Sequence, residues 1–194
     1  MKYYHIDRSG LLNEGQTIST NQSFIPNNDY GKLLIEKFFP NGVSKHGEHY
    51  LNDNVYMFQP NFSLVDNILK SNTINSIYFA EYTFELVRRL YFSTELSRYT
   101  SLFALENLEE LNLWSELKSG EYRIFEIVTN NTYSTFDANF LKGGLCVSKN
   151  PLYQGFSPSI NFNQAFSYWS KEKSNNPKPE VLLPLPLTIG RRVL

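Results

Sequence analysis

Glu180 is the side chain whose position in this sequence best suits catalysis. It follows a polar, proline-containing stretch, 171–179, and directly precedes the apolar run 181–183, which predicts a strand. A carboxylate at the first residue of a strand can face a cleft while the apolar residues that follow it are buried in the core. There it could stabilise a developing positive charge or accept a proton. Because charged residues are usually exposed, the alternative is a solvated glutamate at a strand end.

His5 and Arg98 are the other residues whose side chains could take part in catalysis or ligand binding. His5 follows two tyrosines in a segment, 2–6, that predicts a strand, where a lone histidine more often makes a structural hydrogen bond than a ligand contact. Arg98 lies in 97–104, which predicts an extended, partly apolar segment. An arginine there is costly unless it meets an anion or a carboxylate, and the alternative is an edge-strand arginine in water. Phe103 is by default a core residue and otherwise a stacking platform.

Other catalytic and metal sites lack their sequence patterns. The chain contains no G-x-S-x-G, no P-loop and no G-x-G-x-x-G. Its single cysteine, Cys146, cannot form an internal disulfide or hold zinc alone, and as a nucleophile it would need a histidine that the sequence cannot place near it. His46 and His49 have only Glu48 and Asp53 beside them, a weak metal signal. We therefore predict no metal.

The elements that must position these residues mix helices and strands without regular alternation. The patterns predict helices over 30–39, 62–69 and about 77–91, and strands over 2–6, 122–128, 180–184 and 187–194, the last two as a strand pair interrupted by proline. The segment 43–60 has no clear period. Irregular alternation favours an α+β fold.

Local signals refine three of the helices. In the third, the expected buried stripe consists of Ile77, Ala80, Phe84, Val87 and Tyr91. Glu85 and Arg89 would pair on its outer side. Asn107 with Glu110 predicts a capping box that starts a further helix. Asn161 or Asn163 would cap a last helix carrying Ala165, Phe166 and Trp169.

Length and composition suit one domain in a reducing compartment. The chain has 194 residues, of which 41% are hydrophobic, enough for a sizeable core without disulfides. A net charge of −1 gives no reason to expect tight nonspecific nucleic-acid binding. The first ten residues contain no long apolar run, so we expect no signal peptide, and no stretch reaches the ~18 apolar residues of a membrane helix. We therefore expect a cytoplasmic protein without a membrane partner.

Three segments together resemble the ADP-ribosyltransferase superfamily, and within it a bacterial group. They are residues 3–18 (YYHIDRSGLLNEGQTI), 97–111 (SRYTSLFALENLEEL) and 179–194 (PEVLLPLPLTIGRRVL). In the superfamily a histidine-bearing first strand, a strand with a central aromatic, and a glutamate heading an E-V-L-x-P strand occur in this order. The resemblance implies one domain over 1–194, with a split β-sheet core and flanking helices. Residues 19–75 would then be a helical insertion.

The resemblance also assigns roles. Glu180 would be the catalytic carboxylate and bind the 2′-hydroxyl of the nicotinamide ribose of NAD. His5 would hydrogen-bond the adenosine-side ribose, and Phe103 would stack on nicotinamide, where the superfamily often has tyrosine. Either of two arginines would meet the pyrophosphate. The implied cofactor-binding set is His5, Arg8, Arg98, Ser101 and Phe103.

The implied activity is NAD-dependent mono-ADP-ribosyl transfer, with NAD as substrate. Arginine-modifying members often carry a glutamate or glutamine two residues before the catalytic one, and Lys178 stands there, so arginine is a less suitable acceptor. Related bacterial enzymes include toxins and anti-phage effectors, which implies a nucleic-acid or protein acceptor and an antitoxin partner. The alternatives are a non-catalytic protein-interaction module on the same fold and an NAD glycohydrolase.

Overall fold

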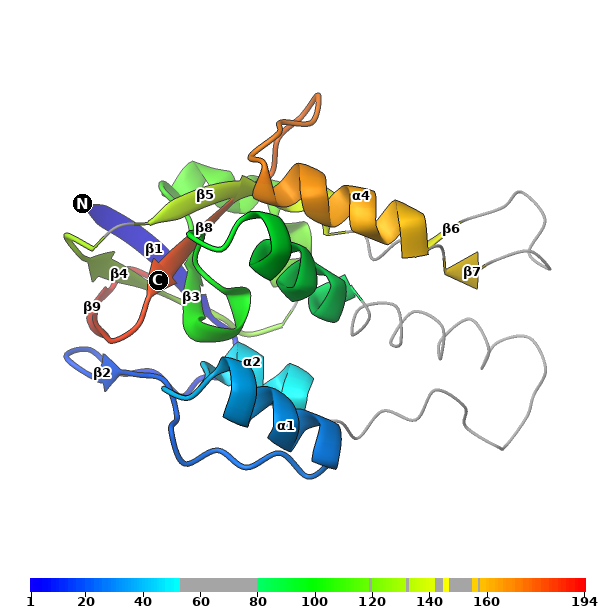
Figure 1. Ribbon diagram of the computed structural model, residues 1–194. Helices are drawn as coiled ribbons and strands as arrows, with labels where there is room; N and C mark the ends of the chain where they lie inside the picture. Colours follow the sequence, from blue (N-terminus) through cyan, green and yellow to red (C-terminus); the bar gives the residue numbers. More distant parts are fainter. Residues whose placement is uncertain (53–79, 119, 132, 142–144, 147–154, 157) are drawn as a thin grey trace, which may run out of the picture.

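Short strands and helices follow one another without a repeating unit. The computed structural model describes residues 1–52, 80–118, 120–131, 133–141, 145–146, 155–156 and 158–194 (Figure 1). Within these residues the strands are β1 (Lys2–Asp7), β2 (Thr17–Ile18), β3 (Ser101–Ala104), β4 (Arg123–Val128), β5 (Ser134–Asp137), β6 (Leu145–Cys146), β7 (Gly155–Phe156), β8 (Pro179–Pro184) and β9 (Leu187–Arg192). The α-helices are α1 (Asp29–Phe38), α2 (Lys45–Leu51), residues 80–91 and α4 (Pro158–Trp169). The 3-10 helices are η1 (Arg98–Thr100), η2 (Leu108–Leu113), η3 (Ser115–Lys118) and η4 (Ala138–Phe140).

Two antiparallel sheets form the centre of the fold, which confirms the α+β class. Their strand orders are β1-β4-β9-β2 and β3-β8-β5, and β6 pairs with β7 separately. Tyr4 and Leu105 join the two larger sheets, because each backbone N–H donates to the other's carbonyl at 2.9 Å. This bridge brings β1, near the N-terminus, beside β3 in the middle of the chain.

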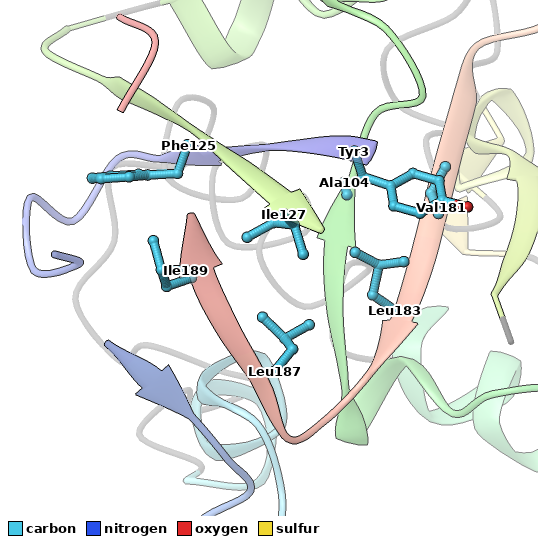
Figure 2. Close-up of a cluster of buried hydrophobic side chains, with 8 residues drawn as sticks. All are labelled: Tyr3, Ala104, Phe125, Ile127, Val181, Leu183, Leu187 and Ile189. Carbon is cyan, nitrogen blue, oxygen red and sulfur yellow. The ribbon is translucent and has the colours of Figure 1, made fainter. Parts of the chain in front are cut away.

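The main core lies between these two sheets (Figure 2). Its buried side chains are Tyr3, Ala104, Phe125, Ile127, Val181, Leu183, Leu187 and Ile189. In β8, alternate residues serve different faces: Val181 and Leu183 enter this core, whereas Leu182 packs with residues of α4 and of helix 80–91. Both faces of β8 are covered, which explains why residues 181–183 of its sequence form a continuous apolar run.

Several predicted elements are confirmed. The strands over 2–6 and 122–128 are β1 and β4, and the helix over 30–39 is α1. The Asn107 side chain accepts a hydrogen bond from the backbone N–H of Glu110 at 3.2 Å, as predicted, although the helix that it caps is 3-10. The helix predicted over 62–69 lies outside the described residues. The insertion over 19–75 stays a prediction.

Other predictions were wrong. β8 and β9 do not pair with each other but lie in different sheets. Part of 97–104 is η1 rather than extended chain. Helix α4 begins at Pro158, so Asn161 and Asn163 lie inside it, and the Asn161 amide donates to the Thr83 hydroxyl at 2.7 Å. A side-chain amide can find such a partner within a helix as well as at its start, and the sequence does not distinguish the two.

Helix 80–91 also departs from its prediction. Ala80, Phe84 and Val87 are buried as expected, but Tyr91 is exposed. Glu85 is buried rather than on the outer side, since its carboxylate accepts from the Ser97 hydroxyl at 2.8 Å and meets two arginines of its own helix. The Ser97 hydroxyl that helps to make this burial favourable lies 12 residues further along the chain, beyond the end of the helix, where helical periodicity does not reveal it.

Helix α2 is an element that the sequence did not predict, because seven residues with a central glycine show no period. A Cβ atom at Gly47 would lie 2.5 Å from the Tyr99 carbonyl oxygen and 2.7 Å from Cβ of Val43. Two donors of Ser44, its N–H at 2.8 Å and its hydroxyl at 3.0 Å, bind the same Tyr99 carbonyl. Helix α2 is therefore docked directly on the backbone of η1.

This docking predicts the effect of Gly47→Ala. Glycine to alanine inside a helix ordinarily stabilises it by about 1 kcal/mol. Here we expect the free energy of unfolding to fall by about 1–3 kcal/mol, because the new methyl group collides with backbone. Urea denaturation measures the change, with exposed Lys45→Ala in the same helix as control. A Gly47→Ala protein at least as stable as wild type would show that α2 and η1 are not in contact.

Asp7 organises the turn after β1 and gives a pH prediction. Burial alone would raise the pKa of Asp7, but hydrogen bonds from Ser9, Arg123 and Leu12 outweigh it and lower that pKa from 3.8 to about 2. The stabilisation from these bonds is therefore complete above about pH 4 and lost as the pH falls through about 2. We expect Asp7→Asn to destabilise the protein at neutral pH and the difference from wild type to shrink in acid. Exposed Asp29→Asn is the control, and a pH-independent difference would contradict the assignment.

Candidate functional site

A cavity of about 260 Å³ lies where β1, η1, β3 and the start of β8 meet. This volume is close to the lower end of the range for small-molecule pockets. Its lining includes four residues that sequence analysis singled out: His5, Arg98, Phe103 and Glu180. A larger hollow of about 770 Å³ beside residues 19–23 contains none of them. The smaller cavity is therefore the candidate site.

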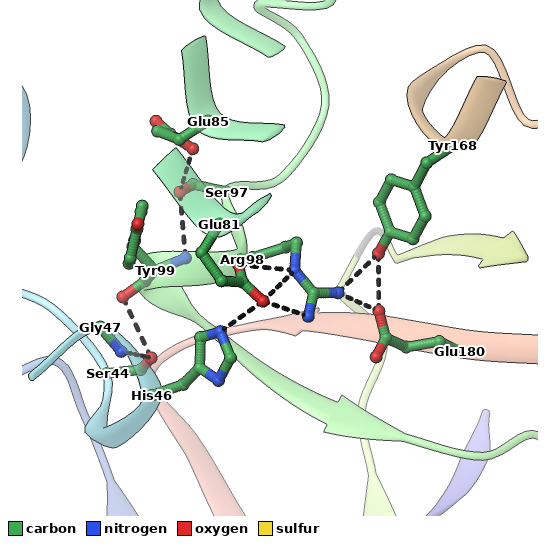
Figure 3. A network of polar contacts seen from close by, with 10 residues as sticks. All are labelled: Ser44, His46, Gly47, Glu81, Glu85, Ser97, Arg98, Tyr99, Tyr168 and Glu180. Atoms are coloured by element: carbon green, nitrogen blue, oxygen red, sulfur yellow. Dashed lines mark hydrogen bonds and ion pairs between the residues drawn. The ribbon is translucent and has the colours of Figure 1, made fainter. Parts of the chain in front are cut away.

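Glu180 points away from the main core for a simple reason of strand geometry. It alternates with Val181 and so shares the face of Leu182, toward α4. Its Oε1 atom accepts from the Tyr168 hydroxyl at 2.6 Å and from the Arg98 guanidinium. Its Oε2 atom has no hydrogen-bond partner among the described residues, and in Figure 3 it points away from both donors. Oε2 is thus the oxygen available to a ligand.

Arg98 is buried between two carboxylates (Figure 3). It donates to both oxygens of Glu81, from Nη2 at 2.9 Å and Nε at 3.0 Å, while Nη1 donates to Glu180. Its guanidinium carbon lies 4.8 Å from the centre of the Phe103 ring. Burial alone would lower the pKa of Arg98, but Glu180 and Glu81 outweigh it and raise that pKa well above its ordinary value. Arg98 therefore remains charged.

The network carries an excess of negative charge. Burial would raise the pKa of Glu81, but Arg98 and His46 outweigh it and hold that pKa below its ordinary range. Burial, and then Glu180, raise the pKa of Tyr168, so its hydroxyl stays a donor. Glu81 and Glu180 share the single guanidinium of Arg98, so the formal charges of these three side chains sum to −1. A cation in the cavity would be attracted to it.

His5 lies on β1 and is tied to β3. Its Nδ1 lies 2.7 Å from the Phe103 carbonyl oxygen, which can only accept, so Nδ1 carries the proton. Burial lowers the pKa of His5, and this outweighs the opposite effects of that hydrogen bond and of Asp7. The ring is therefore neutral, and its Nε2 atom is an acceptor for a ligand hydroxyl.

The remaining predicted residues lie elsewhere. Arg8 is exposed and is not part of the cavity lining. Ser101 is buried, its hydroxyl donates to the Ser97 carbonyl at 2.7 Å, and it is not part of the lining either. The cavity thus brings together His5, Arg98, Phe103 and Glu180 and leaves these two out.

Sequence analysis missed four residues of the site: His46, Glu81, Trp114 and Tyr168. One signal could have found Glu81: Glu81, Glu85 and Arg88 recur at steps of four and three, next to the apolar stripe of the same helix, and all three are buried. Trp114 lines the cavity, and its indole N–H donates to the Pro179 carbonyl at 3.2 Å. No local pattern marks Trp114 or Tyr168, since their roles depend on strand β8 far along the chain.

The buried pairs predict a large effect of removing Arg98. Arg98→Met leaves the carboxylates of Glu81 and Glu180 buried without their counter-charge, so we expect the free energy of unfolding at neutral pH to fall by about 3–5 kcal/mol. The loss should shrink in acid, where the carboxylates take up protons. Urea denaturation between neutral and acidic pH measures both effects. Arg89→Met, at a more exposed arginine on helix 80–91, is the comparison, and an Arg98→Met protein as stable as wild type would contradict the network.

Among the described residues, no group of three or more His, Cys, Asp or Glu could hold a metal ion, and no helix is long and apolar enough to cross a membrane.

Comparison with known proteins places the chain in a family. No curated protein matches the sequence. A family model described as "Protein of unknown function (DUF2441)" matches residues 3–193, which include every residue of the cavity lining. The chain therefore belongs to the DUF2441 family.

Proposed function

We propose that the protein is an NAD-dependent mono-ADP-ribosyltransferase and that its reaction takes place in this cavity. The observation that carries the proposal is the convergence of the two chain ends on one site. His5 and Glu180 line the same cavity, together with Phe103 on β3, the strand that pairs with β8. A neutral imidazole, an aromatic face and a carboxylate with one free oxygen are the groups that the proposed reaction needs.

The charge of the site fits the charge of the substrate. The nicotinamide ring of NAD is a cation, and breaking its bond to ribose gives an oxocarbenium-like sugar. The net negative charge of Glu81, Glu180 and Arg98 would attract the first and stabilise the second. The electron pair of the broken bond leaves with nicotinamide, which becomes neutral.

Each residue then has a defined task. The Oε2 atom of Glu180 accepts from the 2′-hydroxyl of the nicotinamide ribose, while Tyr168 and Arg98 hold the other carboxylate oxygen in place. His5 accepts from a ribose hydroxyl through Nε2. Phe103 stacks on the nicotinamide ring. Its aromatic face takes the place of the tyrosine that is common in the superfamily, but Phe103 has no hydroxyl. Arg98 supports Glu180 rather than reaching the pyrophosphate directly.

The biological setting follows from the resemblance rather than from the cavity. The acceptor would be a group on a cellular protein or nucleic acid, as for a toxin or anti-phage effector, and an antitoxin would restrain the activity in the cytoplasm. An NAD glycohydrolase would use the same site with water as acceptor. A non-catalytic interaction module is less well supported, since it would not need a buried carboxylate held with one oxygen open to a cavity.

Glu180→Gln tests the proposal directly. The amide keeps an oxygen for the Tyr168 hydroxyl but loses the charge, so we expect nicotinamide release from NAD to fall about 10²–10³-fold. Chromatography of nicotinamide and ADP-ribose measures the rate, and thermal unfolding shows that the variant is folded. Exposed Glu109→Gln, on η2, is the matched control and should keep the wild-type rate.

Binding is measured separately from cleavage. Trp114 lines the cavity, whereas Trp169, the last residue of α4, is buried in the core, so NAD should quench the fluorescence of Trp114. A Trp114→Phe protein should lose this signal. Quenching without nicotinamide release would indicate a binding module. A wild type that neither binds nor cleaves NAD, or a Glu180→Gln protein with the full rate, would overturn the proposal.

A further inference from the structure

We propose that His46, oriented by Glu81, is the general base that accepts the proton of a hydroxyl acceptor during transfer. The inference rests on the proposed function, and it names both a second catalytic residue and the chemical class of the acceptor. It is carried by one juxtaposition: a histidine that lines the cavity and has a buried carboxylate at one of its ring nitrogens.

His46 is held rigidly with respect to Arg98. It lies in the first turn of α2, whose Ser44 cap binds the Tyr99 carbonyl through two hydrogen bonds. Tyr99 directly follows Arg98 in η1, so the same contact fixes both side chains. The ring of His46 also packs edge-on against Phe103, with ring centres 4.6 Å apart.

Glu81 determines which nitrogen of His46 is free. The Nε2 atom lies 3.4 Å from Oε1 of Glu81, an electrostatic contact outside hydrogen-bond geometry. Because a carboxylate oxygen can only accept, we place the proton of the neutral ring on this nitrogen. The other nitrogen, Nδ1, has no partner among the described residues and lies on the side of the ring turned away from Glu81 (Figure 3). An imidazole with a carboxylate at one nitrogen and a lone pair at the other is the arrangement of a general base.

His5 is less suited to this task, although it lines the same cavity. Its Nδ1 is tied to a backbone carbonyl rather than to a carboxylate, and burial lowers its pKa. Asp7 favours the imidazolium that would form, but in the described part of the chain no hydrogen bond or ion pair joins its carboxylate to the His5 ring. His46 has Glu81 for that purpose, and Glu81 has in addition both donors of Arg98 to keep it ionised.

The proposed step balances as follows. The C1′–N bond of NAD breaks, and its electron pair leaves with neutral nicotinamide. The oxygen of an alcohol or of water forms the new bond to C1′, and its proton moves to Nδ1 of His46, which later releases it to solvent. The products are nicotinamide, an O-linked ADP-ribose and one proton. A base at this position serves an acceptor that must lose a proton as it attacks, and a hydroxyl group is the acceptor class that we propose.

His46→Gln separates the base from its structural contacts, because the glutamine amide can still donate to Glu81 but cannot take up a proton. Reactions contain NAD in water and in aqueous methanol, and the products measured are nicotinamide, ADP-ribose and O-methyl ADP-ribose. We expect formation of both O-linked products to fall about 10²–10⁴-fold. In His46→Ala, where the space of the ring is vacant, added imidazole should restore part of the rate, while NAD binding by His46→Gln, measured by Trp114 fluorescence, stays within about twofold of wild type. His49→Gln, at an exposed histidine of the same helix, is the matched control.

The outcomes distinguish the inference from the proposed function. A wild-type rate for His46→Gln, or a slow rate of His46→Ala that imidazole does not raise, would overturn the role of His46 and leave NAD cleavage at Glu180 intact. The product identifies the acceptor, because water gives ADP-ribose and methanol gives O-methyl ADP-ribose. A wild type that releases no nicotinamide would overturn the proposed function and this step with it.

Discussion

The buried guanidinium of Arg98 is the interaction on which the rest of the site depends. Removing a charged side chain from water is costly, and the structure offsets this cost with two carboxylates and a tyrosine hydroxyl that come from separate parts of the chain. Glu81 lies on helix 80–91, Glu180 on β8 and Tyr168 on α4. Because Arg98 needs all three, these elements cannot shift relative to one another without leaving a buried charge unpaired.

The same contacts leave one oxygen of Glu180 without a protein partner among the described residues. Arg98 and Tyr168 both bind Oε1 of Glu180, so the carboxylate is held at one oxygen and open at the other. Glu81 and Glu180 have one guanidinium between them, so the formal charges of the three side chains sum to −1. In the proposed function, this charge lies beside the cavity and attracts the positive charge of the substrate.

Sequence reasoning succeeded where a residue's environment is local. Strand β1, helix α1 and the apolar run of β8 follow from short patterns, and the position of Glu180 at the head of that run was enough to single it out. It failed where burial depends on a distant partner. Glu85 and Asn161 are polar residues placed inside by contacts from other segments, and α2, with seven residues, is too short to show a period. The docking of α2 on η1, and hence His46, could not be predicted.

The two histidines show why residue type alone does not assign chemistry. His5 was singled out from the sequence because it lies in a predicted strand, and His46 was considered only as part of a weak metal cluster. In the folded protein both line one cavity, but a carbonyl binds the first and a carboxylate the second. A carbonyl holds the ring in place and favours its charged form too little to outweigh burial, whereas a carboxylate adds a full opposite charge. The neighbour, rather than the imidazole, therefore decides that His5 suits binding and His46 suits proton transfer.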